Sequence, residues 1–185
     1  MAPDVLFRLA QQRSQARLIR FDEQSVNSQH RSKLVKALWE KFRTPLSPAD
    51  DEEFLLKLKL LTTDEDGNIC PSVAGVLMAT EEPHLIIDNA YIQAVAYRGT
   101  ERNAAYQVDS ADIYGPLDRQ IMDAFHFVNK NMKRFATKMP ARQEIPQYSL
   151  QAIFEAIVNA VAHRDYSVYA SKIRLHMFSD RLELF

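Results

Sequence analysis

The stretch Ser149–His163, S-L-Q-A-I-F-E-A-I-V-N-A-V-A-H, says more about the fold than any other part of the sequence. Its interior is apolar at every position except Gln151, Glu155 and Asn159. These three residues and His163 are spaced by four, and each step of four advances only about 40° around a helix that turns roughly 100° per residue. The spacing predicts a helix over 149–163 with one polar stripe on a body otherwise suited to burial.

The polar stripe has two interpretations, and the spacing alone leaves both open. It can face water, as the exposed side of an ordinary amphipathic helix does. It can also face a metal-bound phosphate, because the carboxylate of Glu155 is suited to orient or deprotonate a water molecule. The amide oxygen of Asn159 is a neutral ligand for Mg²⁺ that adds no repulsion toward phosphate.

The residues after this helix predict a β-hairpin over 171–185. Polar and apolar residues alternate along Lys172–Phe178, Ser179–Arg181 form a turn, and a second alternating run follows over Leu182–Phe185. One face of this hairpin is expected to be buried. The sequence stops at Phe185 in mid-pattern, so we expect further residues or another chain to complete the strand, which is otherwise an edge open to pairing.

The residues before the helix predict a second long helix and an extended segment. Gly115-Pro116 opens the helix, which carries an apolar stripe at spacings of three and four that we assign to the core: Leu117, Ile121, Phe125, Val128 and Met132. The segment from Arg142 to Tyr148, with Glu144 and Pro146, is expected to be extended.

The N-terminal part predicts a connecting region. An amphipathic helix or arm is expected over Pro3–Leu18, followed by the polar connector Phe21–His30 and a helix from about Ser32 to Phe42. Ser47 is the expected N-cap of the next helix, with Pro48 at its first position. Residues 1–47 are therefore interpreted as an N-terminal arm and linker helix, and residues 48–185 as the folded region.

The segment Pro48–Tyr97 has the order of a loose winged-helix arrangement. The first helix carries Phe54, Leu55, Leu58 and Leu61; a turn at Asp64–Asn68 leads to a short helix over Val73–Ala79, and a strand follows over Tyr91–Tyr97. DNA binding by this segment is one hypothesis, although its acidic residues Glu81, Glu82 and Asp88 are poor neighbours for phosphates.

Composition indicates a soluble globular protein. Hydrophobic residues make up 46% and charged residues 25% of the 185 positions, and the net charge of −1 does not call for nucleic acid. The single cysteine, Cys70, has no partner for a disulfide and is interpreted as a structural thiol in a reducing compartment. The N-terminus resembles neither a signal peptide nor a membrane span, so we expect a cytoplasmic protein without membrane contact. Together the elements predict an α+β fold with helices packed on a mostly antiparallel sheet.

The run E-A-I-V-N-A-V-A-H-R-D-Y, Glu155–Tyr166, is similar to the N-box of GHKL-type (Bergerat-fold) ATPases. It resembles more closely the RecG-related, helicase-like C-terminal domain of bacterial transcriptional regulators, in which strands ending near D-R-hydrophobic-E follow, as at Asp180–Glu183. Upstream motifs that occur in the order of that family are Arg20–Gln24, Leu60-Leu61, Ala74–Leu77 and Tyr97–Thr100.

This resemblance implies roles for five residues. Glu155 would be the water-activating carboxylate and Asn159 the Mg²⁺ ligand, while His163, Arg164 and Asp165 would border the nucleotide site. The C-terminal part would then be an incomplete GHKL-like layer that uses ATP and Mg²⁺ in the intact protein. In such regulators an AlbA-like (Schlafen-type) DNA-binding domain precedes the region that this chain resembles.

The glycines depart from the ATPase pattern. GHKL proteins carry a D-x-G-x-G box and a glycine-rich lid after the N-box, whereas the four glycines here, Gly67, Gly75, Gly99 and Gly115, all precede it. We therefore expect no tight ATP binding by this chain, and a regulatory or oligomerisation module with a vestigial or truncated ATP site. A homo-oligomer is the expected assembly, and DNA is expected to bind through a domain outside this sequence. The alternatives are a Mg²⁺-ATP-hydrolysing GHKL-type enzyme in a longer protein and the winged-helix DNA binder.

Other candidates are set aside on the sequence. His84, His126 and His176 stand alone in different elements, which argues against a metal site. Ser167, His163 and Asp165 are too close along one turn to form a hydrolase triad. Trp39 and the pair Tyr91 and Tyr97 are interpreted as packing residues, because no Lys or Arg series interleaves with them to make a base-stacking platform.

Overall fold

The computed structural model describes residues 21–137, 143–168 and 171–185. The chain divides into two compact units, Met1–Glu81 (unit 1) and Glu82–Phe185 (unit 2). Helices occur together with a mixed but mostly antiparallel sheet, so the predicted α+β fold class is confirmed. The arm predicted over Pro3–Leu18 lies outside the described residues, and the domain boundary drawn at residue 47 stays a prediction.

Unit 1 is built from short elements around a small core. Its described elements are η1 Phe21–Glu23, η2 Ser28–Lys33, α2 Lys36–Trp39, η3 Glu40–Phe42, α3 Asp51–Lys57, β1 Leu61–Thr63, β2 Ile69–Pro71 and α4 Val73–Ala79. The core contains Trp39, whose ring centroid lies 6.0 Å from that of Phe54, and the packing role predicted for Trp39 is confirmed.

The helix predicted from Ser32 to Phe42 is not continuous. It is replaced by η2, α2 and η3, with extended backbone at Leu34 and Val35. The N–H of Val35 donates to the carbonyl of Ala79 at 2.8 Å, so a bond to the end of α4 replaces a bond within a helix. Local helix propensity is overridden by a contact distant in sequence.

The N-cap predicted at Ser47 is wrong. Helix α3 begins at Asp51, and the carboxylate of Asp50 accepts the N–H of Glu53 at 2.8 Å. Ser47 instead accepts the N–H of Thr44 at 2.9 Å and closes a turn before the helix. The carboxylate of Asp50 supplies both the cap and a negative charge at the positive end of the helix, which favours the later start.

Helix α3 also ends before Leu61, although the sequence pattern predicts Leu61 within this helix. Lys59 has a φ of 60°, outside the helical region, and Leu61 begins strand β1, which pairs with β2. The turn predicted at Asp64–Asn68 joins these strands and is confirmed, although the hairpin was not foreseen. Cys70 is buried in β2, as expected of a structural thiol.

Gly75 explains how α4 packs in unit 1. A Cβ atom placed on this glycine would lie 2.0 Å from the carbonyl oxygen of Leu60, closer than any real contact. The position therefore accepts glycine alone while the helix keeps its distance from the Leu60 backbone. This helix, predicted over Val73–Ala79, is confirmed with the same bounds.

Unit 2 contains the larger sheet. Its described elements are η4 Pro83–Leu85, β3 Ile92–Tyr97, η5 Ala104–Tyr106, β4 Gln107–Ile113, α5 Leu117–Asn131, β5 Arg134–Thr137, β6 Gln143–Pro146, α6 Leu150–Ala162, β7 Ile173–Met177 and β8 Leu182–Leu184. The strand order is β4-β3-β7-β8, with β3 and β7 parallel and the other pairs antiparallel. A parallel pair requires a long crossover, and α5 and α6 lie within it.

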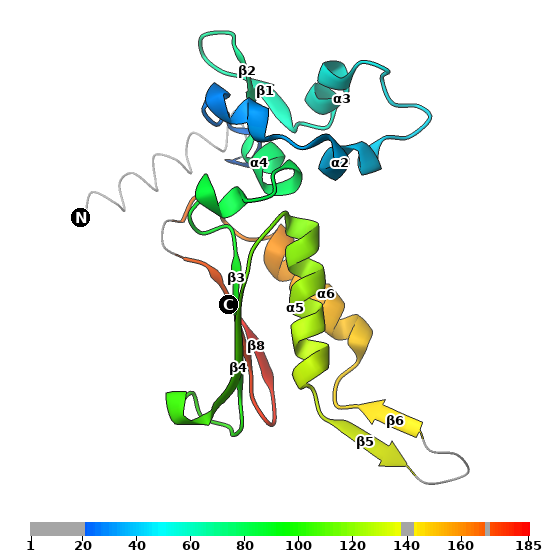
Figure 1. Cartoon of the computed structure of the whole chain (residues 1–185), viewed down its shortest axis with the longest axis vertical. Helices are drawn as coiled ribbons and strands as arrows, with labels where there is room; N and C mark the ends of the chain where they lie inside the picture. The colour runs from blue at the N-terminus through cyan, green and yellow to red at the C-terminus, as the bar shows by residue number, and fades with distance from the viewer. Residues whose placement is uncertain (1–20, 138–142, 169–170) are drawn as a thin grey trace, which may run out of the picture. The chain divides into compact units, whose positions relative to one another are not determined.

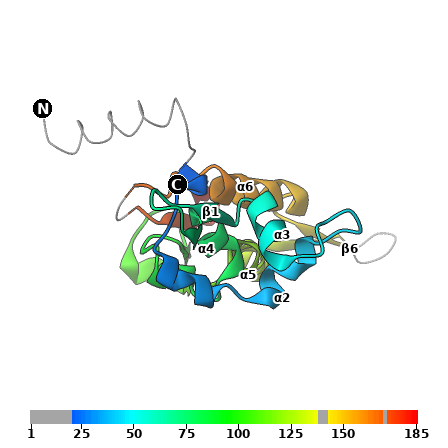
Figure 2. The same cartoon turned by 90° about the horizontal axis from the view of Figure 1, so that it is seen from above.

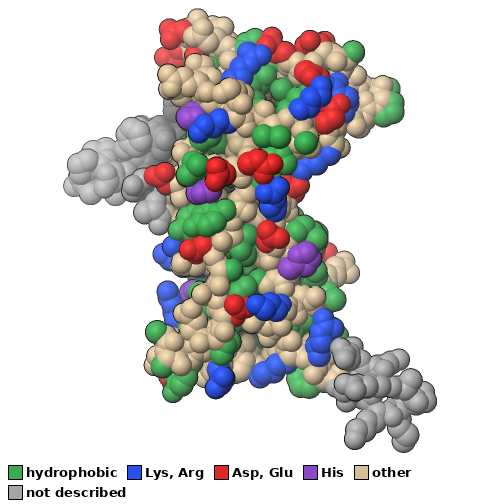
Figure 3. Space-filling view, viewed as in Figure 1, with side chains coloured by type: hydrophobic (Ala, Val, Ile, Leu, Met, Phe, Trp, Pro, Cys, Tyr) green, Lys and Arg blue, Asp and Glu red, His purple; other side chains and the backbone are tan. Residues whose placement is uncertain are grey.

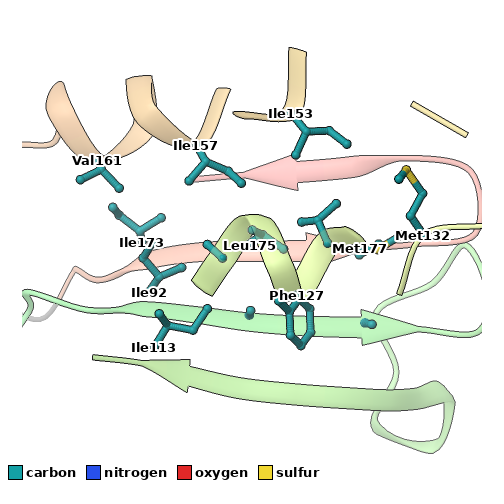
Figure 4. Packing of buried hydrophobic residues seen from close by; sticks show 14 residues of the cluster. Ile92, Ile113, Phe127, Met132, Ile153, Ile157, Val161, Ile173, Leu175 and Met177 are labelled. Atoms are coloured by element: carbon teal, nitrogen blue, oxygen red, sulfur yellow. The ribbon is translucent and has the colours of Figure 1, made fainter. Parts of the chain in front are cut away.

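The two long helices pack side by side on one face of this sheet (Figures 1 and 2). Figure 4 shows Ile153, Ile157 and Val161 of α6 pointing toward Leu175 and neighbouring residues of the strands. On α5, Val128 and the following Met132 are buried, and Leu117, Ile121 and Phe125 pack against the same core. The predicted core stripe of α5 is therefore confirmed.

The remaining predictions for unit 2 are mostly confirmed. Residues 143–146 are extended and form β6, which pairs with β5 in a hairpin that the sequence did not predict. The predicted C-terminal hairpin is present as β7 and β8, and β8 is an edge strand of the described sheet. On the face of β7 opposite the core, His176 is buried and Arg174 is exposed, so burial on this strand is not confined to the one face predicted.

The winged-helix order over Pro48–Tyr97 does not form one structural unit. Helices α3 and α4 belong to unit 1, whereas strand β3 belongs to unit 2 and pairs with β4 and β7. The strand that was to complete the arrangement has its partners later in the chain. The structural basis of the winged-helix interpretation is therefore corrected.

Candidate functional site

Helix α6 carries the candidate site and has well-defined ends. The hydroxyl oxygen of Ser149 accepts the N–H of Ala152 at 3.4 Å, and the N–H of His163 donates to the carbonyl of Asn159 at 3.0 Å. The helix spans Leu150–Ala162, so the prediction of a helix over 149–163 is confirmed, with its outer residues as caps. Packing of the buried residues of α6 against the sheet then turns the polar stripe away from the core.

The polar stripe is exposed in the described structure. Glu155, Asn159 and His163 all lie on the solvent side of α6, opposite the buried Ile157. The Nε2 of Gln151 donates to the Oε1 of Glu155 at 3.0 Å, one helical turn away. Four residues of α-helix rise about 6 Å, so Glu155, Asn159 and His163 form a ladder of functional groups along one face.

Asn159 and His163 remain available to a ligand. Within the described residues, neither side chain makes a hydrogen bond, whereas Glu155 uses one oxygen to accept the amide of Gln151. A free carboxamide next to a carboxylate offers oxygen ligands of the kind that Mg²⁺ accepts. An exposed stripe with free side chains is therefore expected whether the stripe faces water or faces a ligand.

A structured turn follows the helix at Arg164–Tyr166. The guanidinium carbon of Arg164 lies 5.1 Å from the ring centroid of Tyr166, and the hydroxyl of Tyr166 donates to the carbonyl of Val161 at 3.2 Å. Burial raises the pKa of Tyr166 to about 12, so its hydroxyl stays a donor at neutral pH. Burial also lowers the pKa of Arg164 from its usual value. The Nε and Nη2 atoms of Arg164 are buried without a hydrogen-bond partner among the described residues.

Asn89 holds this turn and was not identified from the sequence. Its Nδ2 donates to the carbonyls of Tyr166 at 3.4 Å and Val168 at 2.5 Å, and the side chain is buried. The partners are nearly eighty residues apart in sequence, so no local pattern signals the contact. The Oδ1 of Asn89 is buried and unpartnered among the described residues, which leaves one more polar atom close to this turn.

Asp165 takes part in a local turn. Its Oδ1 accepts the N–H of Ser167 at 2.9 Å and also the Ser167 hydroxyl. Because the carboxylate accepts the serine directly, no imidazole stands between them and the order of a Ser-His-Asp triad is not formed.

The described residues show no cluster of three or more His, Cys, Asp or Glu side chains arranged to hold a metal. Among the same residues, no helix combines the length and the apolar character needed to cross a membrane. The candidate site of this chain is thus the outer face of α6 with its following turn, on a unit of two helices packed against a mixed four-stranded sheet.

Comparisons with known proteins bear on the fold. No protein-family model matches the chain, and no curated protein matches it. The solved structure of the DIP2311 protein from Corynebacterium diphtheriae superposes on 92% of the chain with a TM-score of 0.57 and 17% sequence identity. The chain spans 34% of that protein, so the likeness covers about a third of its length and shows the fold alone.

Proposed function

We propose that this chain is a regulatory module of the class of bacterial transcriptional regulators that its sequence resembles, and that the outer face of α6 forms one wall of a nucleotide site. The observation that supports this most is the exposure of Glu155, Asn159 and His163 in one ladder. Packing requires only that this face be polar, and the residues present are those that the resemblance assigns to Mg²⁺ and ATP.

The residues on this wall suit the magnesium side of such a site. The carboxamide of Asn159 is exposed and free to ligate Mg²⁺, and Glu155 keeps one oxygen to orient a water molecule. Bound Mg²⁺ would neutralise phosphate charge and hold the nucleotide in place. The guanidinium of Arg164, two residues beyond the end of α6, supplies positive charge, and its Nε and Nη2 atoms are buried without a partner among the described residues.

The phosphate side of the site is incomplete in this sequence. All four glycines precede α6, so the backbone turns that bring N–H groups against phosphates do not follow it. Binding by this chain is therefore expected to be weak, with a dissociation constant on the order of 1 mM, which corresponds to about −4 kcal/mol. A site with magnesium ligands but without phosphate-binding turns is what we mean by a truncated or vestigial ATP site.

NMR amide shifts test the proposal at the concentrations that weak binding requires. Addition of Mg²⁺ and a non-hydrolysable ATP analogue is expected to shift amides of Glu155–Asp165, and Asn159→Ala should abolish the shifts. Glu101→Ala, in the exposed loop between β3 and β4 and outside the stripe, is the control and should leave the shifts in place. Shifts that are absent at millimolar ligand, or unchanged by Asn159→Ala, contradict the proposal.

A second candidate function, self-association, rests on an exposed apolar cluster. Leu150 and Phe154 lie one turn apart on α6 and are both well exposed, as is Met122 of α5. Phe154 contacts Phe125 edge-to-face at 5.7 Å, which joins the residues of the two helices into one patch. Exposed apolar patches mark contact sites when they are contiguous.

Sedimentation velocity tests self-association. The wild-type chain is expected to form a dimer with increasing concentration, and Phe154→Glu should shift it to monomer. Phe135→Glu, at an exposed aromatic of β5 outside the cluster, is the control and should leave the association unchanged. A wild-type chain that is monomeric at all concentrations would sink this candidate without affecting the nucleotide site.

A further inference from the structure

The face of the unit 2 sheet that points away from α5 and α6 has a composition of its own. Ile92, Ala94 and Ala96 of β3 belong to the core, and because side chains alternate along a strand, Gln93 and Tyr97 point to the opposite face. We call this the open face and define it by six residues, three aromatic and three basic: Tyr91, Tyr97, Tyr114, Arg102, Lys172 and Arg174. Figure 1 shows both helices on the other side of the sheet.

The parallel register of β3 and β7 interleaves aromatic and basic residues on this face. Gln93 pairs with Arg174. Two residues earlier on each segment, and so on the same face, the Nζ of Lys172 donates to the hydroxyl of Tyr91 at 2.9 Å. The same Nζ lies 5.1 Å from the centroid of the Tyr91 ring. A series of Lys or Arg was missing around the tyrosines in the sequence, but the sheet supplies it from a strand some eighty residues later.

The aromatic rings stand at both ends of the open face. The Tyr114 ring contacts Tyr91, with centroids 5.1 Å apart, and His84, with centroids 4.3 Å apart, and Tyr114 is still 43% exposed. At the other end Tyr97 stacks on Phe178 at 5.1 Å, and the guanidinium carbon of Arg181 lies 4.0 Å from the Phe178 ring. Phe178 is buried, so the ring surface left to a base at this end is that of the half-buried Tyr97. Aromatic rings exposed on a sheet are surfaces on which unpaired bases stack.

A polar pocket of about 340 Å³ opens between these rings. Its lining includes Gln93, Tyr97, Arg102, Gln107, Asp112 and His176. The Nε2 of Gln93 donates to the Oδ1 of Asp112 at 3.2 Å, which leaves amide and carboxylate atoms to face a ligand. Glutamine amides and aspartate carboxylates are groups that read the polar edges of bases, and the volume is that of a small-ligand site.

His176 closes the floor of the pocket. It is buried beside Tyr97 and Phe185, with ring centroids 5.9 Å and 5.8 Å away. Burial, and then the charge of Arg102, lower the pKa of His176, so the imidazole is neutral at pH 7. A neutral imidazole can donate one hydrogen bond and accept another, as a base edge requires.

Charge on the open face favours an anion. Arg102 lines the pocket together with Asp112, Arg174 lies beside Gln93 in the register of β7, and Glu183 is paired with Arg181 at 2.6 Å. Figure 3 shows charges of both signs interspersed over the visible surface, so the net charge of −1 does not describe the charge of any single face. A polyanion that also carries flat, unpaired rings can bind the basic residues through its charges and the aromatic residues by stacking.

We propose that the open face binds single-stranded nucleic acid. One base contacts the exposed part of the Tyr114 ring, another stacks on Tyr97, a base enters the pocket between them, and Arg102 and Arg174 contact phosphates. A duplex hides the faces of its bases, so the open face selects single strands. The proposal does not depend on the nucleotide site of α6, and each can fail without the other.

Fluorescence anisotropy of labelled oligonucleotides of about 12 nucleotides tests the proposal, with DNA and RNA of one sequence and the matching duplex. The wild-type chain should bind the single strands more tightly than the duplex, and the DNA and RNA arms show which is preferred. Arg102→Glu with Arg174→Glu should weaken binding at least tenfold and reduce the salt slope by about 1.4, for two phosphate contacts.

The matched control for charge is Lys33→Glu with Lys57→Glu. Both lysines are exposed in unit 1, and the double variant has the same net charge as the test variant. It should bind within about twofold of wild type. Equal loss in the two double variants, or duplex binding as tight as single-strand binding, overturns the proposal.

Stacking is tested separately from charge. Tyr91→Leu with Tyr114→Leu should weaken single-strand binding by roughly 5- to 150-fold per stacked base. Phe135→Leu, an exposed aromatic on β5, is the control and should bind as wild type does. Circular dichroism confirms that each variant is folded, and a folded tyrosine variant with wild-type affinity overturns the proposal.

Discussion

The two sides of α6 differ in what determines their residues. Ile153, Ile157 and Val161 are buried against the sheet, so packing dictates their size and apolar character. Glu155 and Asn159 contact solvent, and packing asks only that they be polar. Packing therefore explains the residues of the inner side, whereas we propose that binding, and not the stability of the fold, explains the identity of the outer residues.

The sheet of unit 2 repeats this contrast. Its covered face carries Ile92, Leu175 and Met177, which fill the core. Its open face carries Tyr91 and Arg174, whose chemistry the core does not require. Variants on the two sides of each element should therefore separate stability from binding.

The largest effect is expected on the inner side of α6. Ile157 is fully buried, and Ile157→Ala removes packing atoms and leaves a cavity, so it should cost about 2–5 kcal/mol of unfolding free energy. Urea denaturation followed by circular dichroism measures the loss, and hydrogen exchange of β7 amides assigns it to unit 2. A loss under about 1 kcal/mol would show that this side of α6 does not hold the core.

The next effect concerns the turn after α6. Asn89→Ala removes two hydrogen bonds to the carbonyls of Tyr166 and Val168 and should cost about 1–3 kcal/mol. Faster hydrogen exchange over Arg164–Val168 should accompany the loss. Gln151→Ala serves as control, and an Asn89→Ala variant as stable as that control contradicts the role given to Asn89.

A smaller effect depends on pH. Because burial lowers the pKa of His176 in the fold, the unfolded chain binds, between its own pKa and the lower folded pKa, a proton that the folded chain does not. The contribution of the neutral His176 to the free energy of unfolding is therefore complete above about pH 6.5, and it is lost as the pH falls through the lower pKa of the folded state. Thermal unfolding between pH 5 and 8 should show this dependence diminished in His176→Gln and retained in His163→Gln; equal pH dependence in both variants contradicts it.

The smallest effect on stability is expected on the outer side of α6. Glu155 is exposed and its one hydrogen bond is to Gln151, so Glu155→Ala should change the unfolding free energy by no more than about 0.5 kcal/mol. The same urea titration used for Ile157→Ala measures it. A loss of several kcal/mol would mean that Glu155 is a structural group and that the two sides of α6 do not differ as described.

Sequence periodicity predicted the elements whose burial is regular. The stripe of α5, the helix α6 and the alternation of β7 and β8 repeat within a short window, so the pattern alone locates them. The cap at Asp50 and the break at Val35 were missed because neighbouring residues and a bond to Ala79 decide them. Burial of His176 was missed because the residues that cover it, Tyr97 and Phe185, come from other segments of the chain.

The candidate site divides in the same way. The ladder on α6 was visible because helical geometry places every fourth residue on one face. The contact of Asn89 with the turn, and the approach of Lys172 to Tyr91, join residues about eighty positions apart. Such contacts follow from strand order, which the sequence pattern did not specify.

The most direct test of the outer side of α6 measures stability and binding in one experiment. Urea denaturation of wild type and Asn159→Ala is compared with and without Mg²⁺ and the ATP analogue, at about ten times the dissociation constant found by NMR. A ligand that binds only the folded state should then stabilise the wild type by about 1.4 kcal/mol. We predict equal stability of the two proteins without ligand and no stabilisation of Asn159→Ala by it; a variant destabilised without ligand, or stabilised as much as wild type, contradicts the account.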